Sequence, residues 1–171
     1  MKTDEQNPIK AESKPGKNKF KLQVAAGIVS TLAILGTILF LAKSPNMANA
    51  VAITVYKSPT CNCCNRWVDH LRDAGFIVTV KNSGAMDSIK LSAGVMPMLQ
   101  SCHTALVEGY IVEGHVPAND IKRLLRERPA VSGLAVPGMP MGSPGMEGPY
   151  RDPFDVLTFD RNGRTQVYAS Y

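Results

Sequence analysis

The sequence predicts an α/β fold, because stretches with strand character alternate with stretches of helical period. Residues 52–56 and 76–80 are short runs of apolar and β-branched residues. Between them, apolar residues recur at the three- and four-residue spacing of a helix. A strand, a helix and a second strand in this order form a unit whose two strands run parallel. We therefore expect a parallel pair of strands with a helix packed over it.

The elements that follow complete a known order. A short helix is expected at about Met86 to Ser92, and strands at 104–107 and 110–112 are separated by a Glu-Gly turn. A further helix begins after Pro117 and ends before Pro129. The resulting order, β-α-β-α-β-β-α, is that of the thioredoxin fold, so the sequence predicts a thioredoxin-like core.

The composition changes after residue 130. Residues 136–149 contain too much proline and glycine for a helix or a central strand, so they predict a long loop. Two β-rich runs at 154–159 and 164–168, separated by an Asn-Gly turn, predict a C-terminal hairpin. We expect residues 131–171 to form a methionine-containing loop and a hairpin that packs on the core at residues 51–130.

Residues 1–50 predict an export signal. A lysine-rich head is followed by residues 24–42, which carry no charged side chain, and then by the small-x-small sequence Ala48-Asn49-Ala50. The apolar stretch is long for a cleaved signal and just long enough to span a bilayer. Cleavage after Ala50 and an uncleaved anchor at residues 22–42 therefore both stay open. In either case the N-terminal segment contacts the membrane, and the domain is exported to the periplasm or anchored at its face.

The positive charge of the chain belongs mainly to this head. The formal net charge is +5, but from residue 51 onward there are 12 Lys or Arg and 11 Asp or Glu. The domain itself is therefore close to neutral, and no basic surface for nucleic acid is predicted.

All four cysteines lie in two short motifs, which indicates a site rather than disulfides scattered along the chain. Cys61, Cys63 and Cys64 stand at the start of the first helix, and Cys102 stands beside His103 before the third strand. At a helix N-terminus the backbone N–H groups and the dipole favour a thiolate, which both binds soft metals and exchanges disulfides. In the predicted fold these two stretches adjoin, so four sulfur atoms are expected to converge.

Cys63 favours a metal site over a dithiol enzyme, because a third neighbouring thiol would mispair and would bind metal. Soft thiolates select Cu(I), and three or more bridging sulfurs can hold several Cu(I) ions. Further candidate ligands are His103, His115, Met139, Met141 and Met146. Structural explanations stay open for all of these: a histidine bonded to the backbone or to the ligand shell, and methionines that only anchor the loop by packing.

Several motifs resemble those of the CopG-type exported copper-resistance domain. They cover about residues 51–147 and comprise Tyr56 to Cys64 with Trp67, Ser101 to Ala105, Glu113 to Ala118, Gly133 to Pro140 and Gly142 to Glu147. The resemblance implies a thioredoxin-like fold and a periplasmic copper site. It implies that Cys61, Cys63, Cys64 and Cys102 are the ligands, with His103 and the loop methionines nearby.

One position departs from the family pattern. The family usually reads Gly-Val-Pro before the third strand, where thioredoxin folds place a cis-proline, whereas this chain reads Gly94-Val95-Met96-Pro97. We therefore expect a different local backbone before Cys102.

Together, the residues and the resemblance predict an exported copper-binding protein that holds Cu(I), as one or several ions, on a four-thiolate site. Its expected role is copper tolerance or handling, and a copper-export pump or another copper-handling protein is its expected partner. The alternative is a copper or thiol–disulfide oxidoreductase that uses Cys61 and Cys64. A structural zinc domain is disfavoured, because such sites usually pair two CxxC motifs without a third adjacent thiol.

Overall fold

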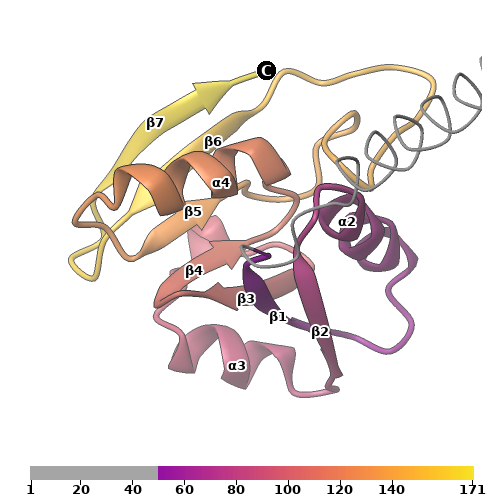
Figure 1. Ribbon diagram of the computed structural model, residues 1–171, viewed down its shortest axis with the longest axis horizontal. Helices are drawn as coiled ribbons and strands as arrows, with labels where there is room; N and C mark the ends of the chain where they lie inside the picture. Colours follow the sequence, from indigo (N-terminus) through magenta and orange to yellow (C-terminus); the bar gives the residue numbers. More distant parts are fainter. Residues whose placement is uncertain (1–49) are drawn as a thin grey trace, which may run out of the picture. The chain divides into compact units, whose positions relative to one another are not determined.

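The sheet of this protein has seven strands in the order β2-β1-β3-β4-β5-β6-β7 (Figure 1). The computed structural model describes residues 50–171, so the predicted export signal at residues 1–49 lies outside the described part. Pairs β1–β2 and β4–β5 are parallel, and the other neighbours are antiparallel. The elements are β1 Ala52–Lys57, α2 Asn62–Asp73, β2 Ile77–Asn82, α3 Met86–Ser92, η2 Pro97–Leu99, β3 His103–Val107, β4 Tyr110–Glu113, α4 Ala118–Glu127, β5 Gly133–Ala135, β6 Asp155–Phe159 and β7 Thr165–Ser170.

The predicted order of helices and strands is found from β1 to α4. Helix α2 forms because its apolar residues share one face, and that face, with Cys64, Trp67, Val68 and Leu71, is buried. The chain leaves the helix through Gly75, whose φ of +90° suits a residue without a Cβ. Within residues 50–171 no helix is long and apolar enough to cross a membrane.

The sequence did not predict strand β5, which precedes the long loop. Strand β5 pairs with β4 on one side and with β6 on the other, so the hairpin β6–β7 extends the same sheet. A Cβ on Gly133 would lie 1.8 Å from the carbonyl oxygen of Ile111, so only glycine permits this pairing. The strand is three residues long and begins with this glycine, which leaves little strand signal in the sequence.

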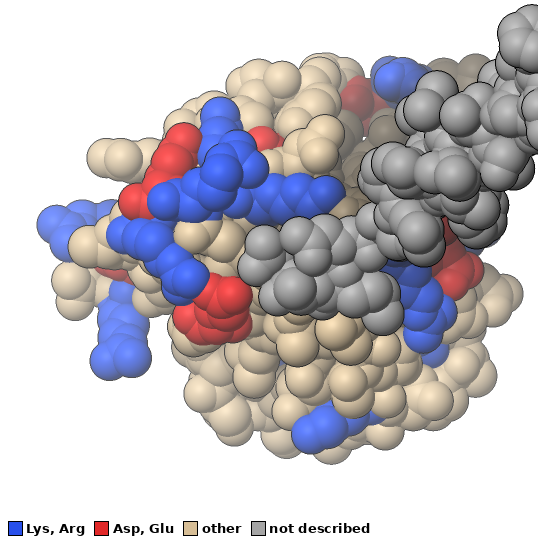
Figure 2. Space-filling view, viewed as in Figure 1, with Lys and Arg blue, Asp and Glu red and all other residues tan. Residues whose placement is uncertain are grey.

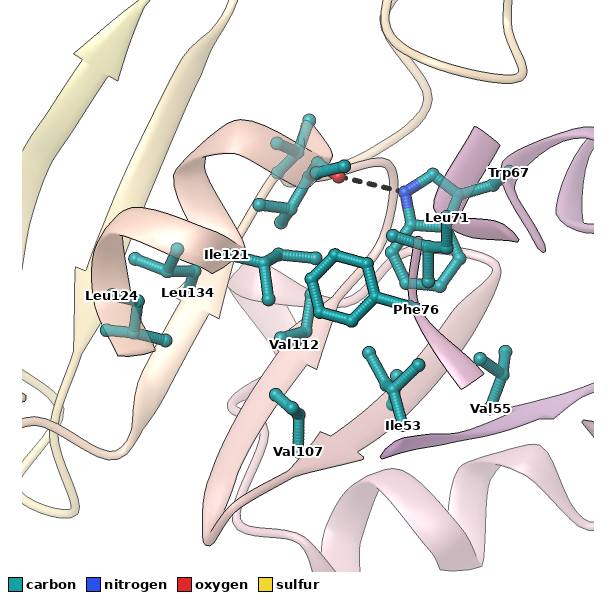
Figure 3. Packing of buried hydrophobic residues seen from close by; sticks show 14 of the residues in the cluster. Ile53, Val55, Trp67, Leu71, Phe76, Val107, Val112, Ile121, Leu124 and Leu134 are labelled. Carbon is teal, nitrogen blue, oxygen red and sulfur yellow. Dashed lines mark hydrogen bonds between the residues drawn. The ribbon is translucent and has the colours of Figure 1, made fainter. Parts of the chain in front are cut away.

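Helices α2 and α4 cover one face of the sheet and enclose the main core (Figures 1 and 3). Its side chains come from both helices and from the strands beneath them, and include Ile53, Val55, Trp67, Leu71, Val107, Val112, Ile121, Leu124 and Leu134. Burying each such side chain stabilises the fold by about 1.5–3 kcal/mol. The indole Nε1 of Trp67 donates to the carbonyl oxygen of Val116 at 2.9 Å, which joins α2 to the segment that leads into α4.

Helix α3 lies on the opposite face of the sheet (Figure 1). Lys90 is 3% exposed, and its Nζ lies 2.5 Å from Oε1 of the fully buried Glu113. Thr104 donates to Oε2 of Glu113 at 2.7 Å, and the backbone N–H of Ser101 donates to Oε1 at 2.7 Å. The buried carboxylate is therefore fully paired, as a buried charge must be.

The segment before β3 is a short turn that contains Pro97. The peptide bond before Pro97 is trans, as are the others in residues 50–171. Pro97 starts the 3-10 turn η2, and the side chain of Met96 packs beside Gly163 in the β6–β7 turn. Met96 therefore belongs to the packing between η2 and the hairpin.

The surface carries charges of both signs close together (Figure 2). On α4, Arg123 lies 3.4 Å from Asp120, and Arg128 beyond its end contacts Glu108. The Arg128–Glu108 pair is exposed and so contributes little to stability, whereas Asp120 is buried.

Candidate metal centre

The first turn of α2 places three cysteines at one end of the sheet. After β1 the chain turns, with the N–H of Cys61 donating to the carbonyl of Ser58 at 3.2 Å. Cys61 is the N-cap residue of the helix, and its sulfur accepts the backbone N–H of Cys64 at 3.3 Å. Cys64 points into the protein and is fully buried, whereas Cys61 and Cys63 are half-buried. The helix N-terminus therefore faces the sulfurs, where its dipole favours negative charge.

Cys102 reaches the same place from the loop before β3. The loop is held on one side by the bond from the Ser101 N–H to Glu113, and on the other by the Ser101 hydroxyl, which donates to the carbonyl of Gly138. Cys102 Sγ lies 3.9 Å from Cys63 Sγ, and the carbonyl of Cys102 lies 3.8 Å from Cys64 Sγ. The buried Lys90–Glu113 pair and the Pro/Gly-rich loop thus both help to place Cys102.

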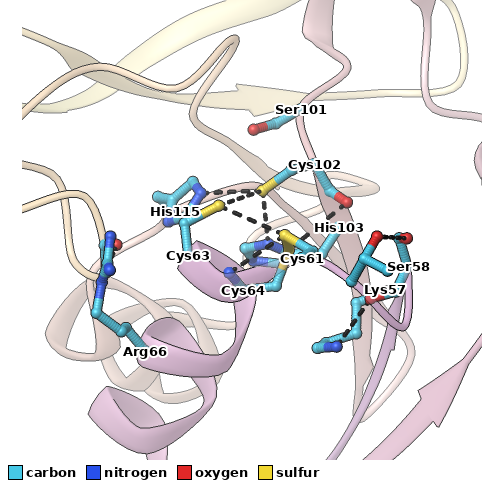
Figure 4. Close-up of a disulfide and its surroundings, with 12 residues drawn as sticks. Lys57, Ser58, Cys61, Cys63, Cys64, Arg66, Ser101, Cys102, His103 and His115 are labelled. Carbon is cyan, nitrogen blue, oxygen red and sulfur yellow. Dashed lines mark hydrogen bonds between the residues drawn. A yellow bond between two sulfur atoms is a disulfide. The ribbon is translucent and has the colours of Figure 1, made fainter.

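The four sulfur atoms lie within 4.8 Å of one another (Figure 4). Cys61 and Cys64 form a disulfide, and Cys63 and Cys102 are free thiols. The structure therefore shows the sulfurs that the sequence expects together, but with two of them oxidised rather than as four thiolates.

Two buried imidazoles complete the cluster. His115 Nε2 lies 3.0 Å and His103 Nδ1 3.2 Å from Cys102 Sγ, and these three ligand atoms also lie within 4.8 Å of one another. The ring of His103 packs against Trp67, with centroids 4.2 Å apart, and meets the ring of His115 edge-on at 4.9 Å. Both predicted histidines therefore contact a site cysteine.

Burial determines the protonation of these groups. It holds the pKa of His103 well below its ordinary value, and His115 nearby acts in the same direction. Burial also lowers the pKa of His115, against the opposing effect of its hydrogen bond to the Pro144 carbonyl. Burial and the neighbouring Cys63 raise the pKa of Cys102 to about 12. Without metal, the site thus holds neutral imidazoles and a protonated Cys102, and an incoming metal ion must displace that proton.

Solved structures of similar chains identify the family. One is titled "Copper resistance protein copG- Form 2". It is 45% identical, with a TM-score of 0.69, and the match covers 72% of this chain and 99% of that chain. The protein belongs to the CopG-type copper-resistance family. A second structure, "Copper resistance protein copG- Form 1", matches at 45% identity with a TM-score of 0.68, over 72% of this chain and 98% of that one.

Two further comparisons bear on the CopG-type chain. Residues 99–146 match the family described as "Protein of unknown function, DUF411", a segment that contains Cys102, both site histidines and most of the loop. No curated protein matches the chain. The family pattern thus includes most of the loop, although the CxCC motif precedes the matched segment.

In this CopG-type protein the loop contacts the site through main-chain atoms. His115 Nδ1 lies 2.8 Å from the carbonyl oxygen of Pro144. A Cβ on Gly145 would lie 2.8 Å from both the Cys63 carbonyl oxygen and the Trp67 nitrogen, so the loop is pressed onto the first turn of α2. Arg66 Nε donates to the Gly145 carbonyl at 2.8 Å and holds the loop there.

The loop methionines are exposed or make contacts within the loop itself. Met139 is 53% exposed, and the thioether of Met141 packs against Gly148 within the loop. Met146 is half-buried, and its N–H donates to the carbonyl of Ser143 at 2.8 Å. These contacts fit packing of Met141 within the loop, and ligation by any of the three remains a prediction.

Sequence reasoning missed three contributors to the site: the Pro144 carbonyl, the close approach at Gly145 and the Lys90–Glu113 pair. A carbonyl carries no signature in a sequence, since every residue has one. For the Lys90–Glu113 pair the sequence offers a weak signal, because Glu113 ends an apolar strand. In the structure Lys90 is the buried residue of α3.

Proposed function

We propose that this protein is an exported copper-binding protein that holds Cu(I) on the sulfurs of Cys61, Cys63, Cys64 and Cys102 after the Cys61–Cys64 disulfide has been reduced. Its role would be copper tolerance or handling. The observation that carries the proposal is the convergence of four sulfurs within 4.8 Å. The titles of the two similar structures, which name copper resistance, support it.

The chemistry of the donors favours copper in its lower oxidation state. Thiolates are soft ligands and select Cu(I) over harder cations. Cys63 Sγ lies 3.4 Å from Cys61 Sγ and 3.9 Å from Cys102 Sγ, so neighbouring sulfurs are close enough to bridge copper ions. We therefore propose that the reduced site takes more than one Cu(I) ion.

We also propose a fold, a cellular location and a partner for the domain. The core is taken to be thioredoxin-like, which the parallel pair β1–β2 beside the antiparallel pair β3–β4 supports. The domain is taken to be periplasmic or anchored by residues 22–42, and to exchange copper with an export pump or another copper-handling protein. The charge-free apolar stretch behind a lysine-rich head supports export.

The first test is anaerobic titration of the phosphine-reduced full chain with Cu(I), in competition with a chromophoric Cu(I) chelator. We expect more than one tightly held copper per chain and protection of all four thiols from alkylation. Cys63→Ser should lower the copper affinity at least about 10-fold, a loss of about 1.4 kcal/mol. Ser58→Ala, which changes an exposed hydroxyl near the site, is the control and should titrate like the wild type. A reduced chain that binds no copper would refute the proposal.

A second function is favoured by the disulfide itself. Cys61 and Cys64 are paired at a helix N-terminus, where a thiolate is stabilised, so a copper or thiol–disulfide oxidoreductase is the alternative. A disulfide-exchange assay separates the two functions. The enzyme should keep its exchange activity in Cys63→Ser, whereas the copper site should lose affinity.

A further inference from the structure

When the Cys61–Cys64 disulfide is formed, two thiols and two imidazoles of the site remain as candidate metal donors. With Cys61 and Cys64 joined, two of the four sulfurs are no longer thiolate ligands. The free thiols of Cys63 and Cys102 remain 3.9 Å apart, and two buried imidazole nitrogens contact the Cys102 sulfur. The oxidised protein thus keeps soft donors on one side of the cluster.

The hydrogen bonds of His115 identify which of its nitrogens is free to bind. The Pro144 carbonyl can only accept, so the bond at 2.8 Å places the proton of the imidazole on Nδ1. Nε2 then carries a lone pair, and it lies 3.0 Å from Cys102 Sγ. Histidines that bind metals usually donate their second N–H to a carbonyl or carboxylate in this way. His115 is therefore organised as a metal ligand.

His103 has the opposite arrangement. Its side chain is fully buried, and Nε2 has no hydrogen-bond partner among residues 50–171. A proton on Nε2 would leave a buried N–H group without an acceptor, which is unfavourable. The proton therefore belongs on Nδ1, which lies 3.2 Å from Cys102 Sγ and can donate to it. In this tautomer the nitrogen of His103 that lies beside the Cys102 sulfur donates a hydrogen bond and has no lone pair for a metal ion.

We propose that, while Cys61 and Cys64 form the disulfide, the protein retains one Cu(I) ion on Cys102 and His115. Cys63, whose sulfur lies 3.9 Å from that of Cys102, moves toward this ion as third ligand, and His103 donates a hydrogen bond to the Cys102 sulfur. This proposal rests on the proposed function, because it assumes that copper is the metal of the site. It adds that the redox state of one cysteine pair sets how much copper the protein holds.

The donor set suits a single monovalent ion. Two thiolates and one neutral imidazole give Cu(I) soft ligands and leave one negative charge. That charge lies at the N-terminus of α2, whose dipole stabilises it, and the N–H of His103 reduces the charge on Cys102. The protons of Cys63 and Cys102 go to solvent when the ion binds.

The test uses the full-length Cys61→Ser/Cys64→Ser variant, which lacks the same two sulfurs and needs no oxidant. We expect one tightly bound Cu(I) per chain in the chelator competition, against more than one for the reduced wild type. X-ray absorption of the copper-loaded variant should show sulfur and one imidazole in the first coordination shell.

The roles of the two histidines are then tested separately in the Cys61→Ser/Cys64→Ser variant. His103→Asn keeps a side-chain N–H near the sulfur and should retain both the bound copper and the imidazole signal. His115→Gln should lose the imidazole signal and weaken copper binding at least about 10-fold. Circular dichroism of each variant checks that the fold is kept.

The failures of the two proposals can be told apart. If the reduced wild type binds copper but the double serine variant binds none, or shows no imidazole, the retained site is refuted and the proposed function stands. An imidazole signal lost in His103→Asn and kept in His115→Gln overturns the assignment of roles. If the reduced wild type itself binds no copper, both proposals fail.

Discussion

The contact between the loop and α2 predicts different effects for two similar substitutions. Gly145 and Gly138 both lie in the loop and both have positive φ, +84° and +67°. Alanine at either position adopts a left-handed conformation at a cost of roughly 1–2 kcal/mol. Around Gly138 nothing lies within 4 Å of the added Cβ. We therefore expect Gly138→Ala to lower the free energy of unfolding by about 1–2 kcal/mol.

Gly145→Ala carries a second penalty. Its Cβ would lie 2.8 Å from the Cys63 carbonyl oxygen and 2.8 Å from the Trp67 nitrogen. Both atoms belong to the backbone of α2 and cannot rotate away, so the loop must move. Overpacking of this kind costs about 1–3 kcal/mol, which brings the total to about 2–5 kcal/mol.

Urea denaturation of the full chain, followed by the fluorescence of its single tryptophan, measures both values. The difference between the two variants isolates the close approach, because the conformational cost is common to both. If the two variants lose the same free energy within about 0.5 kcal/mol, the loop does not press on the helix and the reasoning is wrong. Copper titration of Gly145→Ala adds a functional reading, since its loop also carries the Pro144 carbonyl that orients His115.

Three further changes test the scaffold around the site. Trp67→Phe leaves the buried carbonyl that the indole contacts without its donor, so unfolding monitored by circular dichroism should show a loss of at least about 1–3 kcal/mol. Lys90→Met leaves the Glu113 carboxylate buried without its counter-charge and should cost about 3–5 kcal/mol, whereas adding Glu113→Gln should restore part of that stability in the same denaturation series. His70 Nε2 accepts the N–H of Ala118 at 3.0 Å, and burial lowers the pKa of His70. Because the unfolded chain binds this proton first, the stabilisation is present above about pH 6.5 and is lost as the pH falls below it. His70→Gln keeps an acceptor that cannot titrate, so its stability should fall less than that of the wild type between about pH 7 and pH 5; equal slopes would contradict the capping role.

The sequence was sufficient for elements that repeat a pattern and insufficient for those that depend on a distant partner. The spacing of Trp67 and Leu71 predicted α2, because helical period alone decides which face is buried. Strand β5 could not be predicted, because Gly133 has no strand preference of its own and pairs only where the Ile111 backbone approaches it. Its place in the sheet is a tertiary property.

The same division holds within the site. Four clustered cysteines predict a soft-metal or redox centre from their residue type alone. Their pairing is a matter of geometry, and the structure joins Cys61 to Cys64 while Cys63 stays free. The burial of Glu113 was equally hidden, since it depends on Lys90, which is 23 residues away along the chain. Residue types therefore predict the chemistry of the site, and only the fold shows which contacts hold its residues in place.

The loop over the site contacts the rest of the domain mainly through its backbone. These main-chain contacts affect how the loop sequence can evolve. Around the site its contacts are made by the carbonyls of Gly138, Pro144 and Gly145, while the side chain of Val136 packs in the core and that of Met139 is exposed. A main-chain contact survives almost any side-chain replacement that the local backbone allows. Mutations of the exposed Met139 side chain therefore leave these main-chain contacts in place. Selection can reshape the outer face of the loop to match whichever molecule the protein meets, while the ligands beneath it keep their positions.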